Sequence, residues 1–372
     1  MPMNILYVIW SLKTGGAERC VVNLAKGLDK AKYNPMVCCL NAKGELAQEL
    51  EKEGILVIAL NKRGKFDFSV VRKLVEIMQV NHIQVVHTHL WGANFWGRLA
   101  AKKASVPVVI AHEHGIEQWR GRLHSYLDKV LYKNTDRVVF VSEASRNLFL
   151  SMVKVGPEKC RVVYNGIDVD KFVRSTEYGV PKVKFGIKEN DFVITSVGRL
   201  VREKGHEYLL EAIKLISEKR PNLKVLIVGD GSRMEELKSL KESLGLNGSV
   251  NFLGKRDDIQ DILSATDIFV LASAKEAMPL SILEAMASAR PVVATKVGGI
   301  GEAVIDEKTG LLVSSGNSRE LADAILKLME NPSYAQQLAA AGRRHVEEKF
   351  SLNNWISSIE SLYAQALEEK KG

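Results

Sequence analysis

The chain has 372 residues, of which 46% are hydrophobic and 26% are charged, and its formal net charge is +8. This composition argues against extensive disorder, and the length favours two domains over a single core. The apolar runs fall far short of the ~20 residues that a transmembrane helix needs. We expect no signal peptide, because the start MPMNILYVIW has no basic segment.

The cysteines and the charge indicate a location and a class of ligand. Cys20, Cys38, Cys39 and Cys160 show no C-x-x-C spacing, which is typical of reduced thiols in a cytoplasm. The positive charge suits anionic small ligands, with an anionic membrane surface as the alternative. We expect no nucleic-acid partner, because long basic runs and zinc-finger or RNP signatures are absent. The predicted location is cytoplasmic, with the inner face of a membrane as a peripheral alternative.

The first half of the chain alternates short apolar runs with amphipathic helical patterns. Continuous Val/Ile runs separated by helices indicate a parallel sheet that is covered on both faces. The predicted strands are 5–10, 35–40, 55–60, 84–89, 107–113, 137–142 and 161–164. The predicted helices are 17–30, 45–54, 68–81, 94–105, 124–134 and 144–155.

A polar segment at residues 173–190 predicts a linker, after which the alternation restarts. The later strands are predicted at 192–198, 223–229, 250–254, 268–272, 291–295 and 310–313. The fold class is therefore α/β, with two doubly wound Rossmann-like domains facing a central cleft. We assign the domains to residues 1–172 and 173–350. A helix over residues 351–372 follows, which we consider able to pack back on the N-terminal domain.

Glycines and cations follow the first strand of each predicted domain. Gly15 and Gly16 precede a helix, where backbone N–H groups can approach a phosphate; a simple tight turn is the alternative. The pattern is not G-x-G-x-x-G and no acidic residue ends the second strand, which argues against NAD. Arg199 and Lys204 suit a diphosphate, and the alternative is a solvated basic loop.

Two carboxylates, Glu276 and Glu284, lie eight positions apart around the start of a predicted helix. We expect Pro279 at the first helical position, where its missing N–H costs nothing. Glu276 then precedes the helix and Glu284 lies more than one turn inside it. Carboxylates accept hydrogen bonds from paired hydroxyls, which suits a sugar or ribose. The alternative is an exposed acidic pair at a helix start, where the dipole favours negative charge.

Two histidine pairs end neighbouring apolar runs: His87 with His89, and His112 with His114. Residues i and i+2 of a strand share a face, so either pair could bind a metal. We expect no metal, because no cysteine lies nearby in sequence. Both pairs fall at the carboxyl ends of strands, where a ligand cleft is predicted.

The chain carries seven motifs in a fixed order: GGAER, His-Thr-His, Glu-His-Gly, NGID, GRL-x3-KG, Glu-x7-Glu and GG-x2-E. Together they resemble the motifs of the retaining glycosyltransferases of family 4, which have the GT-B fold. The resemblance covers nearly the whole chain. It implies catalytic roles for His114, Arg199, Lys204 and Glu276. It further implies a donor site made by Gly15, Gly16, Arg199, Lys204, Gly254, Lys255, Arg256, Glu276, Leu280, Ser281 and Glu284. Ala277 and Ala289 depart from the pattern, since many relatives have glycine at both positions.

The resemblance implies a metal-independent, retaining hexosyl- or N-acetylhexosaminyl-transferase that needs no cofactor. The donor is a nucleotide-diphosphate sugar, with UDP favoured over GDP and ADP. The acceptor hydroxyl belongs to a glycan, a lipid-linked molecule or a small molecule, in cell-envelope or other surface polysaccharide or glycolipid synthesis. We place His89, Glu113 and Arg120 on the acceptor side, and consider His87 and His112 structural. The basic and aromatic segments at 62–66 and 124–133 would meet an anionic membrane surface. A nucleotide-sugar epimerase of the same fold and a non-catalytic sugar-nucleotide binding protein are the alternatives.

Overall fold

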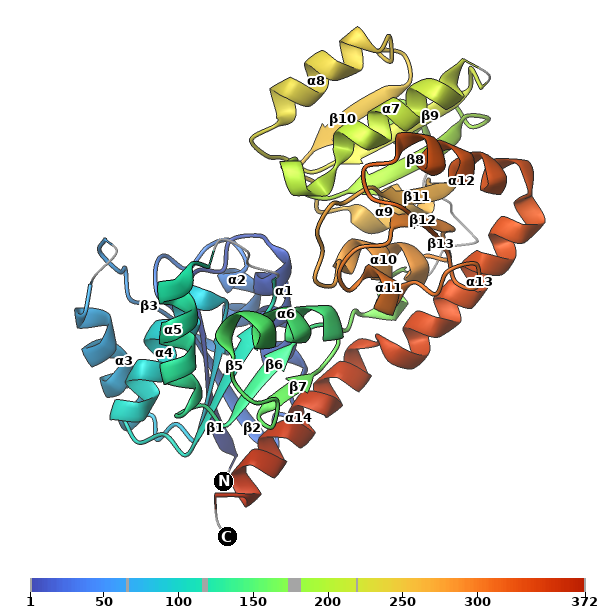
Figure 1. The fold of residues 1–372 in the computed structure, drawn as a ribbon. Coiled ribbons are helices and arrows are strands. Elements are labelled where there is room, and N and C mark those ends of the chain that lie inside the picture. The colour runs from blue at the N-terminus through green and yellow to red at the C-terminus, as the bar shows by residue number, and fades with distance from the viewer. Residues whose placement is uncertain (1, 65–66, 116–119, 173–181, 219, 371–372) are drawn as a thin grey trace. The chain divides into compact units, whose positions relative to one another are not determined.

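The computed structural model describes residues 2–64, 67–115, 120–172, 182–218 and 220–370 (Figure 1). The chain divides into two compact units, Met1–Gly166 with Leu352–Gly372, and Ile167–Ser351. The predicted boundary after residue 172 lies a few residues beyond this division. Residues 173–181 of the predicted linker and residues 65–66 of the predicted basic segment lie outside the described residues.

The N-terminal unit contains a parallel sheet with the order β3-β2-β1-β4-β5-β6-β7 in its described residues. Its strands are β1 (Met3–Ile9), β2 (Tyr33–Cys39), β3 (Leu56–Ala59), β4 (Val85–His89), β5 (Val108–Glu113), β6 (Arg137–Phe140) and β7 (Cys160–Val162). Its helices are α1 (Gly16–Gly27), α2 (Ala47–Lys52), α3 (Ser69–Val80), α4 (Trp91–Lys103), α5 (Arg122–Tyr132), α6 (Glu143–Val153) and α14 (Leu352–Glu368).

Helices cover both faces of this sheet because successive strand residues point to opposite faces. Leu6 and Val8 pack in one apolar core with residues of α3 and α4. The intervening Tyr7 faces α14, where the Tyr363 hydroxyl donates to the Tyr7 hydroxyl at 3.1 Å. The last helix of the chain therefore completes the N-terminal unit, as the labels of Figure 1 show.

The C-terminal unit contains a second parallel sheet, with the order β10-β9-β8-β11-β12-β13 among the described residues. Its strands are β8 (Phe192–Val197), β9 (Leu223–Val228), β10 (Val250–Gly254), β11 (Ile268–Leu271), β12 (Val292–Thr295) and β13 (Leu311–Val313). Its α-helices are α7 (His206–Ser217), α8 (Met234–Ser243), α9 (Ile259–Ser264), α10 (Leu280–Ala287), α11 (Ile300–Ala303), α12 (Ser318–Glu330) and α13 (Pro332–Lys349).

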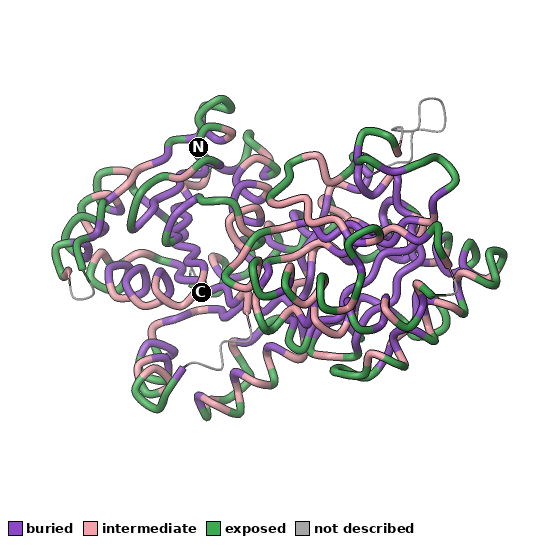
Figure 2. Tube along the Cα trace, turned by 90° about the horizontal axis from the view of Figure 1, so that it is seen from above, coloured by how far each residue is buried: buried purple, intermediate pink, exposed green. Residues whose placement is uncertain are grey.

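The inner strands β4, β5, β11 and β12 of the two sheets are buried, whereas the edge strands β3, β7 and β10 are partly exposed. Buried and exposed stretches alternate along the trace (Figure 2). In each sheet the strand order reverses beside the first strand, between β1 and β4 and between β8 and β11. Such reversal points are where doubly wound sheets bind ligands, at the carboxyl ends of the strands. Among the described residues, none of the helices combines the length and the apolar character that crossing a membrane requires.

Candidate active site

Lys204 and Glu276 form an ion pair beside the carboxyl ends of β8 and β11. Lys204 ends a 3₁₀ turn, Arg202–Lys204, that follows β8, and Glu276 lies in the loop after β11. The two loops are joined, since the Ala274 N–H donates to the Glu203 carbonyl at 2.8 Å. The Lys204 and Glu276 side chains are 17% and 9% exposed. The structure thus brings a predicted phosphate ligand and a predicted sugar ligand into direct contact at a reversal point of strand order.

The Glu276 carboxylate has a second partner, Ser273, that the sequence analysis missed. The buried Ser273 hydroxyl donates to Oε1 at 2.8 Å, and Lys204 contacts the same oxygen. Within the described part of the chain, Oε2 of Glu276 remains available to a ligand hydroxyl. Gly205 brings the Lys204 turn against β11: its φ is +60°, and a Cβ there would lie 2.1 Å from the Ala272 carbonyl oxygen. Only glycine tolerates both conditions.

The start of α10 carries the predicted phosphate-binding N–H groups. The prediction that Pro279 is the first helical residue is wrong, because its ψ of 115° is extended and the helix begins at Leu280. Helix boundaries inferred from pattern commonly miss by a residue. The N–H groups of Leu280 and Ser281 have no acceptor inside the helix and can face an anion. Glu284 is half-buried, more than one turn further along.

The remaining predicted donor residues of this unit lie at the same sheet edge. Arg199 is exposed just after β8. Gly254 ends β10 with a φ of +67°, and the exposed Lys255 and Arg256 follow it. Arg256 forms a bidentate pair with Asp258, with Nε–Oδ1 and Nη2–Oδ2 distances of 2.8 and 2.6 Å. Because β9 separates β10 from β8, the structure does not bring Arg256 to the Lys204–Glu276 pair.

Gly15 and Gly16 stand at the amino end of α1, beyond the carboxyl end of β1. Gly15 is extended (φ −170°), so its conformation does not require glycine. A Cβ at Gly15 would meet the flexible Glu18 carboxylate at 2.3 Å, whereas a Cβ at Gly16 would meet no heavy atom within 4 Å. The space in front of Gly16 is therefore open to a ligand.

His87, His89, His112 and His114 gather into one group, here called the histidine cluster. His89 and His112 are opposite each other in the β4–β5 register. His89 Nδ1 lies 2.8 Å from His114 Nε2, and His87 Nδ1 lies 2.7 Å from the Tyr363 hydroxyl. Burial lowers the pKa of His114 to about 4 and that of His87 to about 3, so both rings are neutral near pH 7. His114 is partly exposed and the other three are fully buried.

Glu113 and Arg120, predicted on the acceptor side, lie inside a buried network of charges. Arg120 contacts Glu113 and reaches Asp128 Oδ2 at 3.3 Å, while Arg98 Nη2 lies 2.5 Å from Asp128 Oδ1. The Asn94 amide donates to Glu113 Oε1 at 2.9 Å. Burial alone would raise the pKa of Glu113, but Arg120 holds it below its ordinary value. Side chains this occupied offer little to an acceptor.

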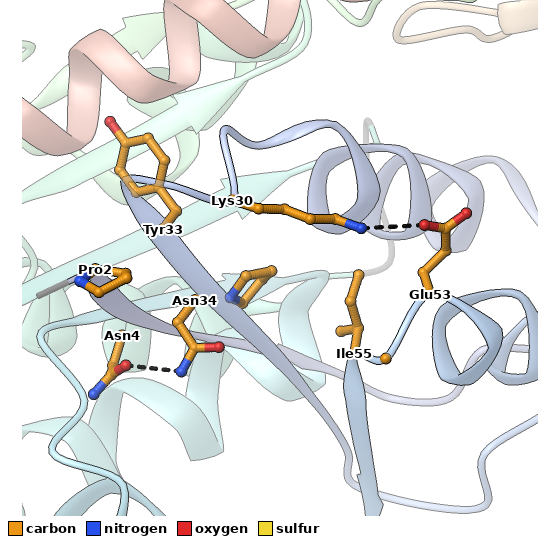
Figure 3. A pocket seen from close by; sticks show the side chains of 9 residues that line it. Pro2, Asn4, Lys30, Tyr33, Asn34, Glu53 and Ile55 are labelled. Atoms are coloured by element: carbon orange, nitrogen blue, oxygen red, sulfur yellow. Dashed lines mark hydrogen bonds and ion pairs between the residues drawn. The ribbon is translucent and has the colours of Figure 1, made fainter.

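A hollow in the N-terminal unit lies away from these residues (Figure 3). It is lined by residues at the amino ends of β1 and β2 and before β3, among them Asn4, Tyr33 and Ile55. Lys30 and Glu53 pair across it at 3.2 Å. Doubly wound sheets bind ligands at the opposite edge, so this hollow is not the candidate site.

Comparison with known proteins agrees with this geometry. Residues 14–171 match the family model "Glycosyltransferase Family 4", and residues 181–345 match "Glycosyl transferases group 1". The chain is 30% identical over 314 residues to UDP-Gal:alpha-D-GlcNAc-diphosphoundecaprenol alpha-1,3-galactosyltransferase of Escherichia coli, covering 82% of this chain and 81% of that protein. It is 26% identical over 312 residues to N-acetyl-alpha-D-glucosaminyl L-malate synthase of Bacillus anthracis, covering 82% and 81%.

Solved structures show the same architecture. Anabaena Alr3699/HepE in complex with UDP matches with a TM-score of 0.88 and 26% identity, over 98% of this chain and 100% of that chain. HepE has also been solved with UDP-glucose, where the TM-score is 0.86 at 26% identity over 96% and 99% of the two chains. Two doubly wound units of this topology, together with these structural neighbours, define the GT-B fold of glycosyltransferases. The chain belongs to glycosyltransferase family 4.

Proposed function

We propose that the protein transfers a sugar from a UDP-sugar to an acceptor hydroxyl, with retention at the anomeric carbon and without a metal ion. The observation that carries the proposal is the Lys204–Glu276 pair at the β8–β11 reversal point. The UDP and UDP-glucose complexes of HepE support the choice of donor. A thermal-stability screen of UDP-, GDP- and ADP-sugars tests it, since a ligand at 100 times its Kd stabilises the native state by about 2.7 kcal/mol. Greater stabilisation by a GDP- or ADP-sugar would overturn the UDP assignment.

Leaving-group charge develops on the β-phosphate as the glycosidic bond breaks. Lys204 and Arg199 supply positive charge there, and the N–H groups of Leu280 and Ser281 supply oriented dipoles. Glu276 Oε2 accepts a hydrogen bond from a hydroxyl of the donor sugar, while Ser273 and Lys204 donate hydrogen bonds to Oε1. Such preorganised donors stabilise the transition state without a rearrangement at the moment of reaction.

The same set of side chains supports the proposal of retention and metal independence. The only carboxylate in the Lys204 contact is Glu276 among the described residues, and we assign it to a sugar hydroxyl. Among the described residues we assign no carboxylate as a nucleophile. In this proposal the leaving phosphate itself takes the acceptor proton on the face where the new bond forms. Two side-chain cations neutralise the diphosphate in place of a divalent ion. Turnover should persist in excess EDTA; activity that EDTA abolishes and Mg²⁺ or Mn²⁺ restores would contradict this.

His114 contributes a neutral imidazole to the donor sugar in this proposal. His89 orients it through the 2.8 Å Nδ1–Nε2 hydrogen bond. Replacing His114 by alanine should lower kcat/KM about tenfold, the worth of one to two hydrogen bonds of ordinary strength. The exposed His82 provides a control in the same unit, and His82→Asn should be fully active. Full activity of the His114 variant would remove this histidine from the site.

We propose a lipid-linked acceptor, and the outer face of α5 supports it. Leu123, Tyr126 and Val130 recur at i, i+3 and i+7 and are 67%, 63% and 44% exposed. The exposed Arg122 and Lys129 lie on the same helix. An apolar stripe with flanking cations suits an anionic membrane surface. The galactosyltransferase relative is named for a diphosphoundecaprenol acceptor, which supports the same class for this chain.

Flotation with anionic vesicles at low salt tests the membrane contact. The wild type should float with the vesicles, and the double variant Leu123→Ser with Tyr126→Ser should not. Val80 is 70% exposed at the end of α3 and provides the matched control, because Val80→Ser removes an apolar group elsewhere in the unit. Wild-type protein that stays with the unbound fraction would argue for a soluble acceptor.

A further inference from the structure

Three histidines of the cluster are arranged as metal ligands. His87 and His89 lie on one face of β4, and His112 is the β5 residue paired with His89. One nitrogen from each of the three rings lies within 4.8 Å of the other two. The ring centroids of His87 and His89 are 4.4 Å apart, and His112 lies 5.3 and 5.2 Å from them. We infer that His87, His89 and His112 form a binding site for one transition-metal ion.

The nitrogens concerned are buried and make no hydrogen bond within the described residues. They are Nε2 of His87, Nε2 of His89 and both ring nitrogens of His112. Buried polar atoms in native proteins nearly always have a partner, and an unpaired one costs about 1–3 kcal/mol. Three such side chains, with nitrogens within 4.8 Å of one another, are explained if they have a common ligand.

The proton positions in the cluster favour coordination through His87 Nε2. The Tyr363 hydroxyl has one proton and donates it to the Tyr7 hydroxyl at 3.1 Å. With its proton donated to Tyr7, the Tyr363 oxygen accepts the Nδ1–H of His87, 2.7 Å away, in the tautomer that coordination requires. This leaves a bare lone pair on His87 Nε2. A metal-bound histidine ordinarily donates its other N–H to an oxygen in this way.

The ligand chemistry selects the class of metal. Burial keeps the imidazoles of His89 and His112 neutral, since it lowers the pKa of each well below its ordinary value. Neutral imidazole suits Zn²⁺, Co²⁺, Ni²⁺ and Cu²⁺, whereas Mg²⁺ and Ca²⁺ prefer oxygen ligands. The site therefore differs in chemistry from one that would hold a diphosphate-bound Mg²⁺. Three protein ligands leave a fourth tetrahedral position for water.

Occupancy of this site would also fix the proton on His114, and this step rests on the proposed function. A metal on His89 Nε2 leaves the proton of that ring on Nδ1, which then donates to His114 Nε2 at 2.8 Å. His114 must in turn carry its own proton on Nδ1. The ion would thus select the tautomer that His114 presents to the donor sugar.

Direct binding tests the site without reference to activity. Chelator-treated full-length protein is titrated with Co²⁺ and Zn²⁺, and the stoichiometry is read by calorimetry and by the visible absorption of tetrahedral Co²⁺. We expect one ion per chain, with affinity unchanged by a large excess of Mg²⁺. His112→Ala should weaken binding at least 100-fold, and His82→Asn should bind like the wild type. Absence of saturable binding by the wild type, or equal binding by the His112 variant, would overturn the site.

Tyr363→Phe provides a second test that leaves all three ligands and the ring volume in place. It removes the oxygen that accepts from His87 Nδ1, and loss of such a supporting contact typically weakens metal binding 10- to 100-fold. A Co²⁺ affinity equal to that of the wild type would overturn the assignment of His87 Nε2 as a ligand. This variant also decides the matter if His112→Ala fails to fold.

Discussion

At the carboxyl edge of the N-terminal sheet, β4 and β5 end in neutral imidazoles that are packed against one another and almost wholly buried. At the corresponding edge of the C-terminal sheet, the loops after β8 and β11 instead present a cation, Lys204, that is 17% exposed and a carboxylate, Glu276, that is 9% exposed. Both edges lie at a reversal of strand order. The same topology therefore supports two chemistries, because the loops and strand ends, and not the sheet, supply the functional groups.

Burial of charge separates the two units further. The N-terminal unit keeps two carboxyl and two guanidinium side chains, Glu113, Asp128, Arg120 and Arg98, almost fully out of water. Every member contacts a group of opposite charge, so the network is stable only when it is complete. The Lys204 side chain, by contrast, can reach solvent, so Lys204 and Glu276 can each exchange the other for a ligand.

The largest effect is expected from Asp128→Ala. The change removes the carboxylate between Arg98 and Arg120 and leaves buried positive charge without compensation. Breaking a buried pair in this way costs about 3–5 kcal/mol. Urea unfolding measures the loss, with Glu49→Ala as the control. Glu49 pairs with Arg19 at 2.8 Å where both side chains are more than a third exposed, and such pairs contribute about 0–1 kcal/mol. Equal losses in the two variants would show that the network is not effectively buried.

A smaller effect, confined to catalysis, is expected from Lys204→Ala. Loss of one preorganised charge at a developing anion typically lowers kcat about 100-fold, or ~2.7 kcal/mol. Steady-state transfer with the preferred nucleotide-sugar measures it. Lys188 is an exposed lysine of the same unit that precedes the amino end of β8, and Lys188→Ala should keep wild-type kcat. A Lys204 variant within a few-fold of wild type would refute the phosphate role.

Gly16→Ala should reduce activity about tenfold without reducing stability. The added Cβ meets no heavy atom of the described residues within 4 Å, so it should interfere only with a ligand that approaches the start of α1.

Gly54 gives the opposite case: a Cβ there would also meet no described heavy atom within 4 Å, but the φ of Gly54 is +76°. Gly54→Ala should cost about 1 kcal/mol of stability and leave transfer unchanged. Donor kinetics and thermal unfolding of both variants measure the contrast. A fully active Gly16 variant would separate this glycine from the donor site.

Local pattern was enough to predict most of the fold and part of the site. Val/Ile runs predicted strands at 84–89 and 107–113, and the structure has Val85–His89 and Val108–Glu113. Lys204 and Glu276 could be singled out because each lies in a loop after a predicted strand and matches a motif of the family. The His87–Tyr363 hydrogen bond spans 276 positions, and no local signal indicates it. The pairing of Arg120 with Asp128 likewise depends on how α5 packs, which spacing along the chain does not encode.

The smallest effect tests a departure from the family pattern, Ala289. The residue follows α10 with a φ of +49°. Its N–H donates to the Met286 carbonyl and that of Arg290 to the Ala285 carbonyl, each at 2.9 Å. This pair of bonds is a Schellman motif, whose left-handed position favours glycine.

The left-handed conformation costs alanine about 1–2 kcal/mol of stability. Glycine avoids this cost but loses more chain entropy on folding, which costs about 0.5–1 kcal/mol. Ala289→Gly should therefore stabilise the protein by about 0.5–1 kcal/mol, measured by urea unfolding, with kcat unchanged. Lower stability of the glycine variant would mean that the unfolded-chain entropy outweighs the strain at this helix end.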